Sequence, residues 1–222
     1  MEKDYESLLN FWNQTFSFDS PYKVESKWCT EEPFNSLIKQ GLLNAKSVLD
    51  YGSGSGWGLF ELYFTSPFEE GLGIDLSENG VKVGNESAKL SKLDDKIKFK
   101  QGDFSLIKNK KFDFISMINV LDVVPDEVTN ELIINLAQTL NKDKYAFVGI
   151  NHIFTEDEIQ RLNFEMNGHY IYKDGILRCN QKTIDEWKSL FSPFFDIVYA
   201  GNYCLTSNES KYPRVGFLLK KK

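Results

Sequence analysis

A glycine-rich turn behind a short apolar run is the feature that most constrains the fold of this 222-residue chain. The segment VLDYGSGSGWG, residues 48–58, ends its apolar run in Asp50 and then places Gly52, Gly54 and Gly56 at every second position. Such a turn lets the backbone approach a ligand closely and presents the start of the next helix to it. The segment therefore predicts a buried strand that ends beside a ligand.

Strand-like and helix-like segments alternate after this turn. Strands alternating with helices imply βαβ units and a mostly parallel sheet with helices on both faces, which is an α/β fold. The expected strands are residues 47–51, 71–76, 97–103, 112–120 and 145–150, and the clearest expected helices between them are 79–92 and 126–141.

The two flanks of the alternating region have a different character. Residues 5–16 and 31–41 have helical patterns, and the later flank predicts helices from Thr155 and Thr183, a hairpin over 170–179 and two final strands. Because no linker is visible, we expect one domain, 1–222. Its parts are a helical segment 1–45, a core 46–150 and a tail 151–222 of helices, hairpin and final strands.

Composition narrows the class of function. The chain has 26 Lys and Arg against 32 Asp and Glu, a net charge of −6, which argues against a general nucleic-acid binder. Its three cysteines form no CxxC pair, so neither a structural zinc site nor a disulfide framework is expected. No signal peptide or long apolar span is visible, which predicts a soluble, cytoplasmic protein without membrane contact. Composition does not predict the oligomeric state.

The glycine spacing excludes two common phosphate-binding loops. A dinucleotide fingerprint, G-x-G-x-x-G, would need its third glycine at Trp57 or Leu59. A P-loop would need Gly-Lys-Ser/Thr at its end, and none follows. The remaining pattern is an acid followed by x-Gly-x-Gly-x-Gly. A turn that only packs a helix on a strand, with Asp50 as its cap, is the alternative interpretation.

Further motifs follow in order. GLGIDLS ends the second expected strand in Asp75, KQGDF places Asp103 after the third, and KFDFISMINVLDVVPD covers the fourth strand and the loop after it. With the glycine turn, this set resembles the class I S-adenosylmethionine-dependent methyltransferases, over about residues 33–150. The resemblance implies seven strands in the order 3-2-1-4-5-7-6, with the last strand antiparallel.

The resemblance also implies the cofactor, S-adenosylmethionine, with S-adenosylhomocysteine as product. Asp50 suits the cationic methionine end, Asp75 the ribose hydroxyls, and Asp103 the adenine amino group. Residues 1–45 would then be a lid over the cofactor, 46–150 the cofactor-binding core and 151–222 the substrate side. The predicted cofactor contacts are Asp50, Gly52, Ser53, Gly54, Gly56, Asp75, Leu76, Asp103, Phe104 and Asn119.

Two residues are candidates for catalysis. Many small-molecule members of the family carry histidine where this chain has Asp122. Asp122 either orients or deprotonates an acceptor, or it caps the next helix. His152 follows the fifth strand on the expected ligand edge and is either a general base or a surface or capping histidine. We predict that both reach the acceptor, with His152 as base and Asp122 orienting. His169 beside the hairpin is a weaker candidate.

The expected reaction is in-line methyl transfer to a small-molecule nucleophile, without a metal. Positioning in such a reaction can supply roughly 7–11 kcal/mol. An RNA or protein methyltransferase and a non-catalytic S-adenosylmethionine-binding module remain as alternatives. The aromatics of residues 5–16, Tyr22 and Trp28 either cover the ligand or belong to the core. The 170–179 hairpin either roofs the acceptor pocket or extends the sheet.

Overall fold

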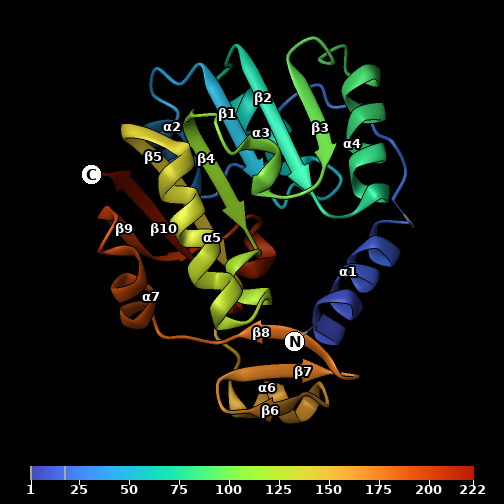
Figure 1. Ribbon diagram of the computed structural model, residues 1–222, viewed down its shortest axis with the longest axis vertical. Coiled ribbons are helices and arrows are strands. Elements are labelled where there is room, and N and C mark those ends of the chain that lie inside the picture. The colour runs from blue at the N-terminus through green and yellow to red at the C-terminus, as the bar shows by residue number, and fades with distance from the viewer. Residues whose placement is uncertain (1, 18) are drawn as a thin grey trace.

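The computed structural model describes residues 2–17 and 19–222, with the side chains of residues 7, 9–17 and 19–222. Its main sheet has seven strands in the order β3-β2-β1-β4-β5-β10-β9, and β10 is antiparallel to both of its neighbours (Figure 1). This confirms the predicted order 3-2-1-4-5-7-6. The strands are β1 (Ser47–Tyr51), β2 (Glu70–Asp75), β3 (Ile97–Gln101), β4 (Phe112–Ile118), β5 (Leu140–Ile150), β9 (Phe195–Tyr203) and β10 (Arg214–Lys221).

Helices cover both faces of the sheet, because its central strands are apolar on both sides. Val48 and Phe114 point into one hydrophobic core, while their neighbours Leu49 and Ile115 point into the other, as the period of two in a strand requires. The first core contains residues of α2 (Phe34–Gly41), α3 (Trp57–Thr65) and α4 (Glu78–Leu90), and the second contains residues of α5 (Asp126–Thr139) and α7 (Ile184–Phe191).

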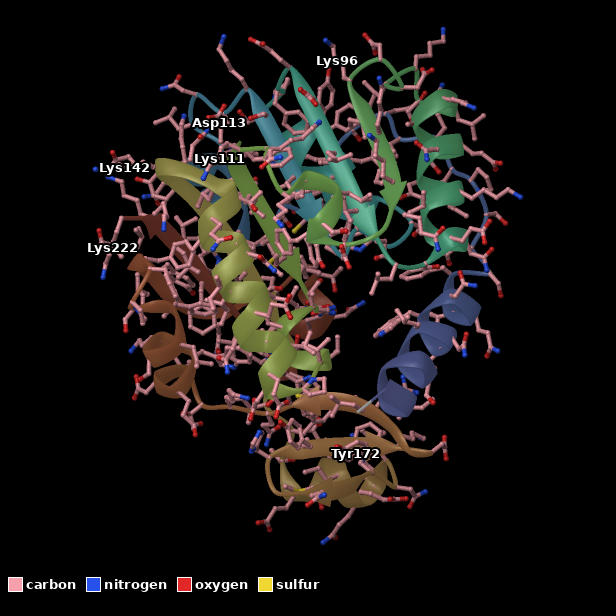
Figure 2. The ribbon with its side chains drawn as sticks, viewed as in Figure 1. Lys96, Lys111, Asp113, Lys142, Tyr172 and Lys222 are labelled. Carbon is pink, nitrogen blue, oxygen red and sulfur yellow. The ribbon has the colours of Figure 1, made fainter. Side chains whose placement is uncertain are left out.

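The predicted hairpin belongs to a separate three-stranded sheet and does not extend the main one. This sheet consists of β6 (Glu165–Asn167), β7 (Tyr170–Lys173) and β8 (Ile176–Asn180). Its turn has φ of 54° at Asp174 and 74° at Gly175, as expected of a tight hairpin. The small sheet, where Tyr172 lies, is beyond the carboxyl ends of the parallel strands of the main sheet, whereas Asp113 lies near their amino ends (Figure 2).

The remaining elements flank these sheets. Both predicted capping boxes are present, at Thr155 before α6 (Glu156–Arg161) and at Thr183 before α7. The N-terminal helix α1 (Glu2–Phe16) starts earlier than predicted, and three short 3-10 helices are η1 (Phe104–Ile107), η2 (Leu121–Val123) and η3 (Ser207–Lys211). In the part of the chain described here, no helix is both long and apolar enough to span a bilayer.

Strand boundaries differ where polar residues hide a strand or a left-handed residue ends one. β5 starts at Leu140, five residues before the predicted start. The prediction missed this part of the strand because the residues after Leu140, NKDK, are polar and at most partly buried. β4 stops at Ile118 because Asn119 has a positive φ of 57°. Strand β3 ends at Gln101, before Gly102 with its φ of 144°.

Candidate active site

The glycine turn between β1 and α3 has backbone angles that other residues adopt only at a cost. Gly52 and Gly54 have φ of 75° and 52°. A Cβ atom on Gly52 would lie 2.3 Å from Val120 Cγ2, and one on Gly54 would lie 2.7 Å from Phe16 Cζ. Both positions therefore require glycine for conformation and for space. The turn is held against β2, because the Gly52 N–H donates to the Ile74 carbonyl at 2.7 Å.

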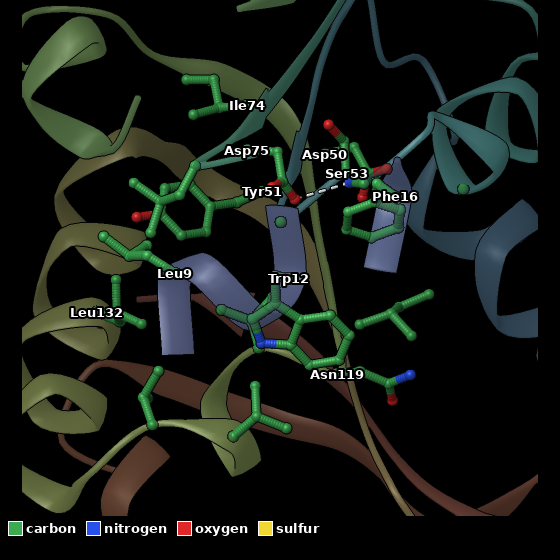
Figure 3. Close-up of a pocket in the computed structure, with 18 of the residues that line it drawn as sticks. Leu9, Trp12, Phe16, Asp50, Tyr51, Ser53, Ile74, Asp75, Asn119 and Leu132 are labelled. Atoms are coloured by element: carbon green, nitrogen blue, oxygen red, sulfur yellow. Dashed lines mark hydrogen bonds between the residues drawn. The ribbon is translucent and has the colours of Figure 1, made fainter. Parts of the chain in front are cut away.

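A cavity of about 200 Å³ lies beside this turn, at the carboxyl ends of β1, β2 and β4 (Figure 3). Open parallel sheets bind ligands at the carboxyl ends of their strands, beside the point in the sheet where the strand order reverses. Seven of the ten predicted cofactor contacts line the cavity, namely Asp50, Gly52, Ser53, Gly54, Asp75, Leu76 and Asn119.

Asp75 ends β2 and faces the glycine turn. Its Oδ2 accepts a hydrogen bond from the Gly54 N–H at 2.8 Å, and its Oδ1 accepts one from the Ser77 N–H at 2.8 Å (Figure 3). Burial raises the pKa of this carboxyl, while these backbone donors oppose the rise. Each carboxylate oxygen has further acceptor capacity, so Asp75 can still accept from a pair of ligand hydroxyls.

Asp50 ends the apolar run of β1 and is only 4% exposed. Burial raises its pKa to about 7, and the nearby charge of Asp75 adds to the rise. Helix α3 passes so close that a Cβ on Gly58 would lie 2.9 Å from Asp50 Oδ2. A buried carboxyl of this kind gains most from a cationic ligand group, which would restore its ionised form. Sequence analysis did not single out Gly58.

Three predicted cofactor contacts lie outside the cavity lining. Gly56 precedes α3, and a Cβ there would lie 2.5 Å from the Phe99 ring. Asp103 is exposed and accepts a hydrogen bond from the Ser105 N–H at 2.8 Å, which caps η1. Phe104 is buried and stacks on Tyr51 with ring centroids 4.1 Å apart. Roles of Gly56, Asp103 and Phe104 as cofactor contacts therefore stay predictions.

Helix α1 forms one wall of the cavity. Leu9, Trp12 and Phe16 line it, and the Trp12 and Phe16 rings stack with centroids 6.2 Å apart. The small sheet packs against α1, because the Arg178 guanidinium of β8 lies 4.0 Å from the centroid of the Phe11 ring. These contacts place the aromatic N-terminal helix at the cavity rather than only in the core.

Tyr22 and Trp28 lie outside the cavity lining. The Tyr22 hydroxyl donates to the Ser55 carbonyl at 3.2 Å, and the Trp28 ring packs edge-on against Trp57 at 5.5 Å between centroids. Tyr22 and Trp28, two of the predicted lid aromatics, therefore anchor the chain that follows α1. Trp57 itself lines the cavity.

The side of the cavity away from the acids is apolar. It is formed by the end of β4, the segment that contains η2, and the start of α5, and its residues are Ile118, Val120, Val123, Val124, Val128 and Leu132. Strand β8 packs against η2 and α1, so the small sheet supports this wall from outside.

Neither candidate for catalysis lines the cavity. Asp122 is 1% exposed, and its Oδ2 accepts from the backbone and side-chain N–H groups of Asn151 at 2.9 and 2.8 Å. Burial raises the pKa of Asp122. The His152 Nε2 lies 3.1 Å from Glu158 Oε1, and its ring packs on Phe154. Neither side chain therefore reaches the cavity lining, and the catalytic roles of Asp122 and His152 stay predictions.

His169 also has a partner away from the cavity. Its Nε2 lies 3.0 Å from Asp126 Oδ2, at the start of α5. Asp126 also pairs with Lys182 at 2.5 Å, and the hydrogen bonds and charge around this carboxyl hold its pKa below the usual range. This cluster joins the small sheet to α5, and a functional role of His169 stays a prediction.

Sequence reasoning missed Arg214, at the start of β10. Its Nη1 donates to Asn119 Oδ1 at 3.0 Å, while its Nε and Nη2 donate to Glu209 Oε1 at 3.1 and 3.0 Å. No local motif could have identified it, because 95 residues separate Arg214 from Asn119. The contact exists only because β10 inserts beside β5.

The polar groups that line the cavity fit a ligand with a cationic end and a pair of hydroxyls. Asp50 offers a buried carboxyl to the cation, and Asp75 offers two oxygens to the hydroxyls. Ser53 Oγ is buried and has no hydrogen-bond partner within the described part of the chain, which leaves it available to a ligand.

Comparison with known proteins identifies the family. Residues 42–194, more than half of the chain, match a family model described as a methyltransferase domain. The chain is also 36% identical over 80 residues to the protein-lysine N-methyltransferase EFM4 of Saccharomyces cerevisiae, a match that covers 35% of each protein. The matches span less than half the length of the curated relatives, 44% and 35%.

Solved structures share the fold. The N-methyltransferase NodS of Bradyrhizobium japonicum, in complex with S-adenosylhomocysteine, has a TM-score of 0.63 at 12% identity, covering 96% of this chain and 98% of that one. The 1,6-didemethyltoxoflavin-N1-methyltransferase of Burkholderia thailandensis has a TM-score of 0.63 at 14% identity, covering 86% and 77%. With its sheet order and its glycine turn, this chain belongs to the S-adenosylmethionine-dependent methyltransferase family.

Proposed function

We propose that this protein transfers a methyl group from S-adenosylmethionine to a small molecule. The observation that carries the proposal is that Asp50 and Asp75, which end neighbouring strands, both line one cavity beside the glycine turn. When bound, S-adenosylmethionine supplies a sulfonium-activated methyl group for an in-line displacement that leaves S-adenosylhomocysteine. The protein then has to orient the acceptor and exclude water.

The cofactor-side residues have distinct roles in this proposal. Asp50 holds the ammonium of the methionine end, and its carboxyl, with a pKa of about 7 in the ligand-free protein, ionises when the cation arrives. Asp75 accepts hydrogen bonds from the ribose hydroxyls. Gly52 and Gly54 let the backbone pass beside the methionine end, and Ser53 contributes the buried hydroxyl.

The apolar wall supports a small-molecule acceptor. Aliphatic side chains from β4, the η2 segment and α5 face Leu9 and Trp12 of α1 across the cavity. An acceptor between them is largely desolvated, which suits an apolar molecule of limited size. The net charge of −6 gives no electrostatic attraction for RNA.

A protein acceptor is the second candidate, and the similarity to the yeast protein-lysine N-methyltransferase favours it. A lysine side chain would have to enter the cavity past α1, whose Trp12 and Phe16 line it. The wall that α1 adds to the cavity makes a small molecule the better fit. The cytoplasmic location also stays a prediction.

Catalytic assistance by His152 and Asp122 stays a prediction. The geometry favours a structural role for His152, because its Nε2 faces Glu158 and its ring packs on Phe154. Asp122 in turn fixes the backbone of Asn151. In the proposed reaction, positioning by the cavity walls supplies the main acceleration.

Two measurements test the proposed function. Calorimetry should detect binding of S-adenosylhomocysteine but not of NAD or ATP, and equal binding of NAD would refute the cofactor. Incubation with radiolabelled S-adenosylmethionine and either a small-molecule extract or a protein fraction of the same cells then separates the acceptor classes. We expect label in the small molecules. Label in proteins would favour the lysine alternative, and no transfer despite tight binding would favour a non-catalytic module.

A further inference from the structure

We infer that Arg214, held by Glu209, is a positioning residue that turns the Asn119 amide so that its Nδ2 donates to the carboxylate of the cofactor's methionine end. The inference rests on the proposed function. It concerns a part of the cofactor for which the acids of the cavity provide no partner.

The charges that line the cavity pose the problem. The methionine end carries an ammonium and a carboxylate side by side. The lining includes the acids Asp50 and Asp75, but among the described residues no lysine, arginine or histidine lines the cavity. A carboxylate near two acids is repelled unless hydrogen-bond donors surround it. The site therefore needs neutral donors at the methionine end.

Asn119 lies where such a donor is needed. It follows β4 and lines the cavity (Figure 3). Its neighbour Val120 lies against the glycine turn, where a Cβ on Gly52 would come within 2.3 Å of Val120 Cγ2. The backbone of Asn119 is fixed, because its N–H donates to the Gly149 carbonyl at 2.8 Å. Its φ of 57° is a conformation that asparagine tolerates better than most residues.

The Arg214 contact decides which end of the amide faces the ligand. A guanidinium can only donate hydrogen bonds, so the atom of Asn119 that lies 3.0 Å from Arg214 Nη1 has to be the oxygen, Oδ1. The other end of the amide is Nδ2, with two donors. Within the described part of the chain, no group accepts from Nδ2. Asn119 is therefore oriented to offer a donor to a ligand.

Arg214 is itself held firmly. Two of its nitrogens bind one oxygen of Glu209, and the other Glu209 oxygen accepts from the Leu205 N–H at 2.8 Å. Its Nη1 also lies 3.5 Å from Asn151 Oδ1, beside the buried Asp122. The carboxylate of Glu209 balances the positive charge of Arg214. Arg214 therefore acts mainly by fixing the orientation of the Asn119 amide, and less by electrostatic attraction of the ligand.

The test compares ligands that differ at the methionine end. Calorimetry is run with S-adenosylhomocysteine, with decarboxylated S-adenosylmethionine, which keeps the ammonium but lacks the carboxylate, and with 5′-methylthioadenosine, which lacks both. The central variant is Asn119→Asp. Aspartate keeps the bond to Arg214 and tolerates the backbone conformation, but it has no donor for the ligand. Arg214→Met removes the anchor, and Arg214→Lys keeps a single charge without the fork.

We expect Asn119→Asp to weaken S-adenosylhomocysteine binding by at least about tenfold, the loss typical of a hydrogen bond to a charged group. Binding of 5′-methylthioadenosine should change less than about twofold on the same scale, and decarboxylated S-adenosylmethionine, whose ammonium meets an added negative charge, should not bind more weakly. Arg214→Met should weaken only S-adenosylhomocysteine, by a smaller factor, and Arg214→Lys should restore part of it. Thermal melting confirms that each variant is folded, and Asn119→Ser replaces any Asn119→Asp protein that is not.

Two results would overturn the inference and leave the proposed function intact. One is equal weakening of all three ligands, which means that Asn119 acts through the shape of the site. The other is unchanged S-adenosylhomocysteine binding in Asn119→Asp. If the unaltered protein binds none of the three ligands, the proposed function fails, and the inference fails with it.

Discussion

Replacing Asp50 by asparagine should stabilise the ligand-free protein while it removes cofactor binding. Asp50 is buried, and its pKa in the folded protein is about 7, compared with an ordinary pKa of 3.8 for an aspartate side chain. The folded state therefore holds this proton more tightly than the unfolded state does. By linkage, the ionised carboxyl destabilises the fold at a pH above 7, and this cost shrinks as the pH falls towards 3.8.

The size of the effect follows from the difference in pKa. Roughly three pH units at about 1.4 kcal/mol each give about 4 kcal/mol of destabilisation above pH 7. Asparagine has nearly the same shape and no charge, so Asp50→Asn should recover most of this free energy at pH 8. At pH 5, two units below the pKa of Asp50, the advantage of the variant should be smaller by about 2.7 kcal/mol.

Urea unfolding at pH 8 and pH 5 measures this difference directly. Asp103→Asn is the control, because Asp103 follows β3 and is exposed, so this substitution removes an acid without removing a buried charge. With S-adenosylhomocysteine present, the ranking should reverse, since only the unaltered protein gains stability from the ligand. An advantage of Asp50→Asn that is the same at both pH values, or a loss of stability at pH 8, would refute the reasoning.

Three further perturbations test the site. Asp75→Asn should weaken S-adenosylhomocysteine binding by roughly 1.5–3 kcal/mol in calorimetry, because an amide cannot accept from both ribose hydroxyls as a carboxylate does, and unchanged affinity would place the ribose elsewhere. Gly54→Ala should lower the melting temperature and ligand affinity more than Gly175→Ala, because both have positive φ but only Gly54 lacks space for a Cβ. His152→Ala should reduce turnover less than about threefold, whereas a loss of roughly 10²-fold or more would establish it as a general base.

Much of the fold could be predicted because it depends on local patterns. Short apolar runs bounded by glycine and acid marked the central strands, and threonine followed three positions later by glutamate marked the starts of α6 and α7. The start of β5 at Leu140 was missed because the four residues after Leu140 are polar and at most partly buried, so they carry no hydrophobic signal. β6 was missed for the same reason, since all three of its residues are exposed.

At the site, local sequence patterns were enough to identify the acids near the carboxyl ends of β1 and β2 and the glycines that follow β1. The parallel sheet brings the carboxyl ends of neighbouring strands to one edge, so position along the chain is enough to predict that Asp50 and Asp75 meet there. The directions of side chains beyond that edge depend on packing that the local sequence does not encode. This packing turned His152 towards Glu158, which left it outside the cavity lining.

The tertiary structure also decided which distant segments reach the cavity. Insertion of the antiparallel strand β10 beside β5 brings Arg214 to Asn119, and packing of α1 over the glycine turn brings Phe16 to Gly54. These contacts depend on non-local packing, because many helix and strand placements satisfy the same local pattern. Burial, which raises the pKa of Asp50, likewise appears only when the two helical layers close on the sheet.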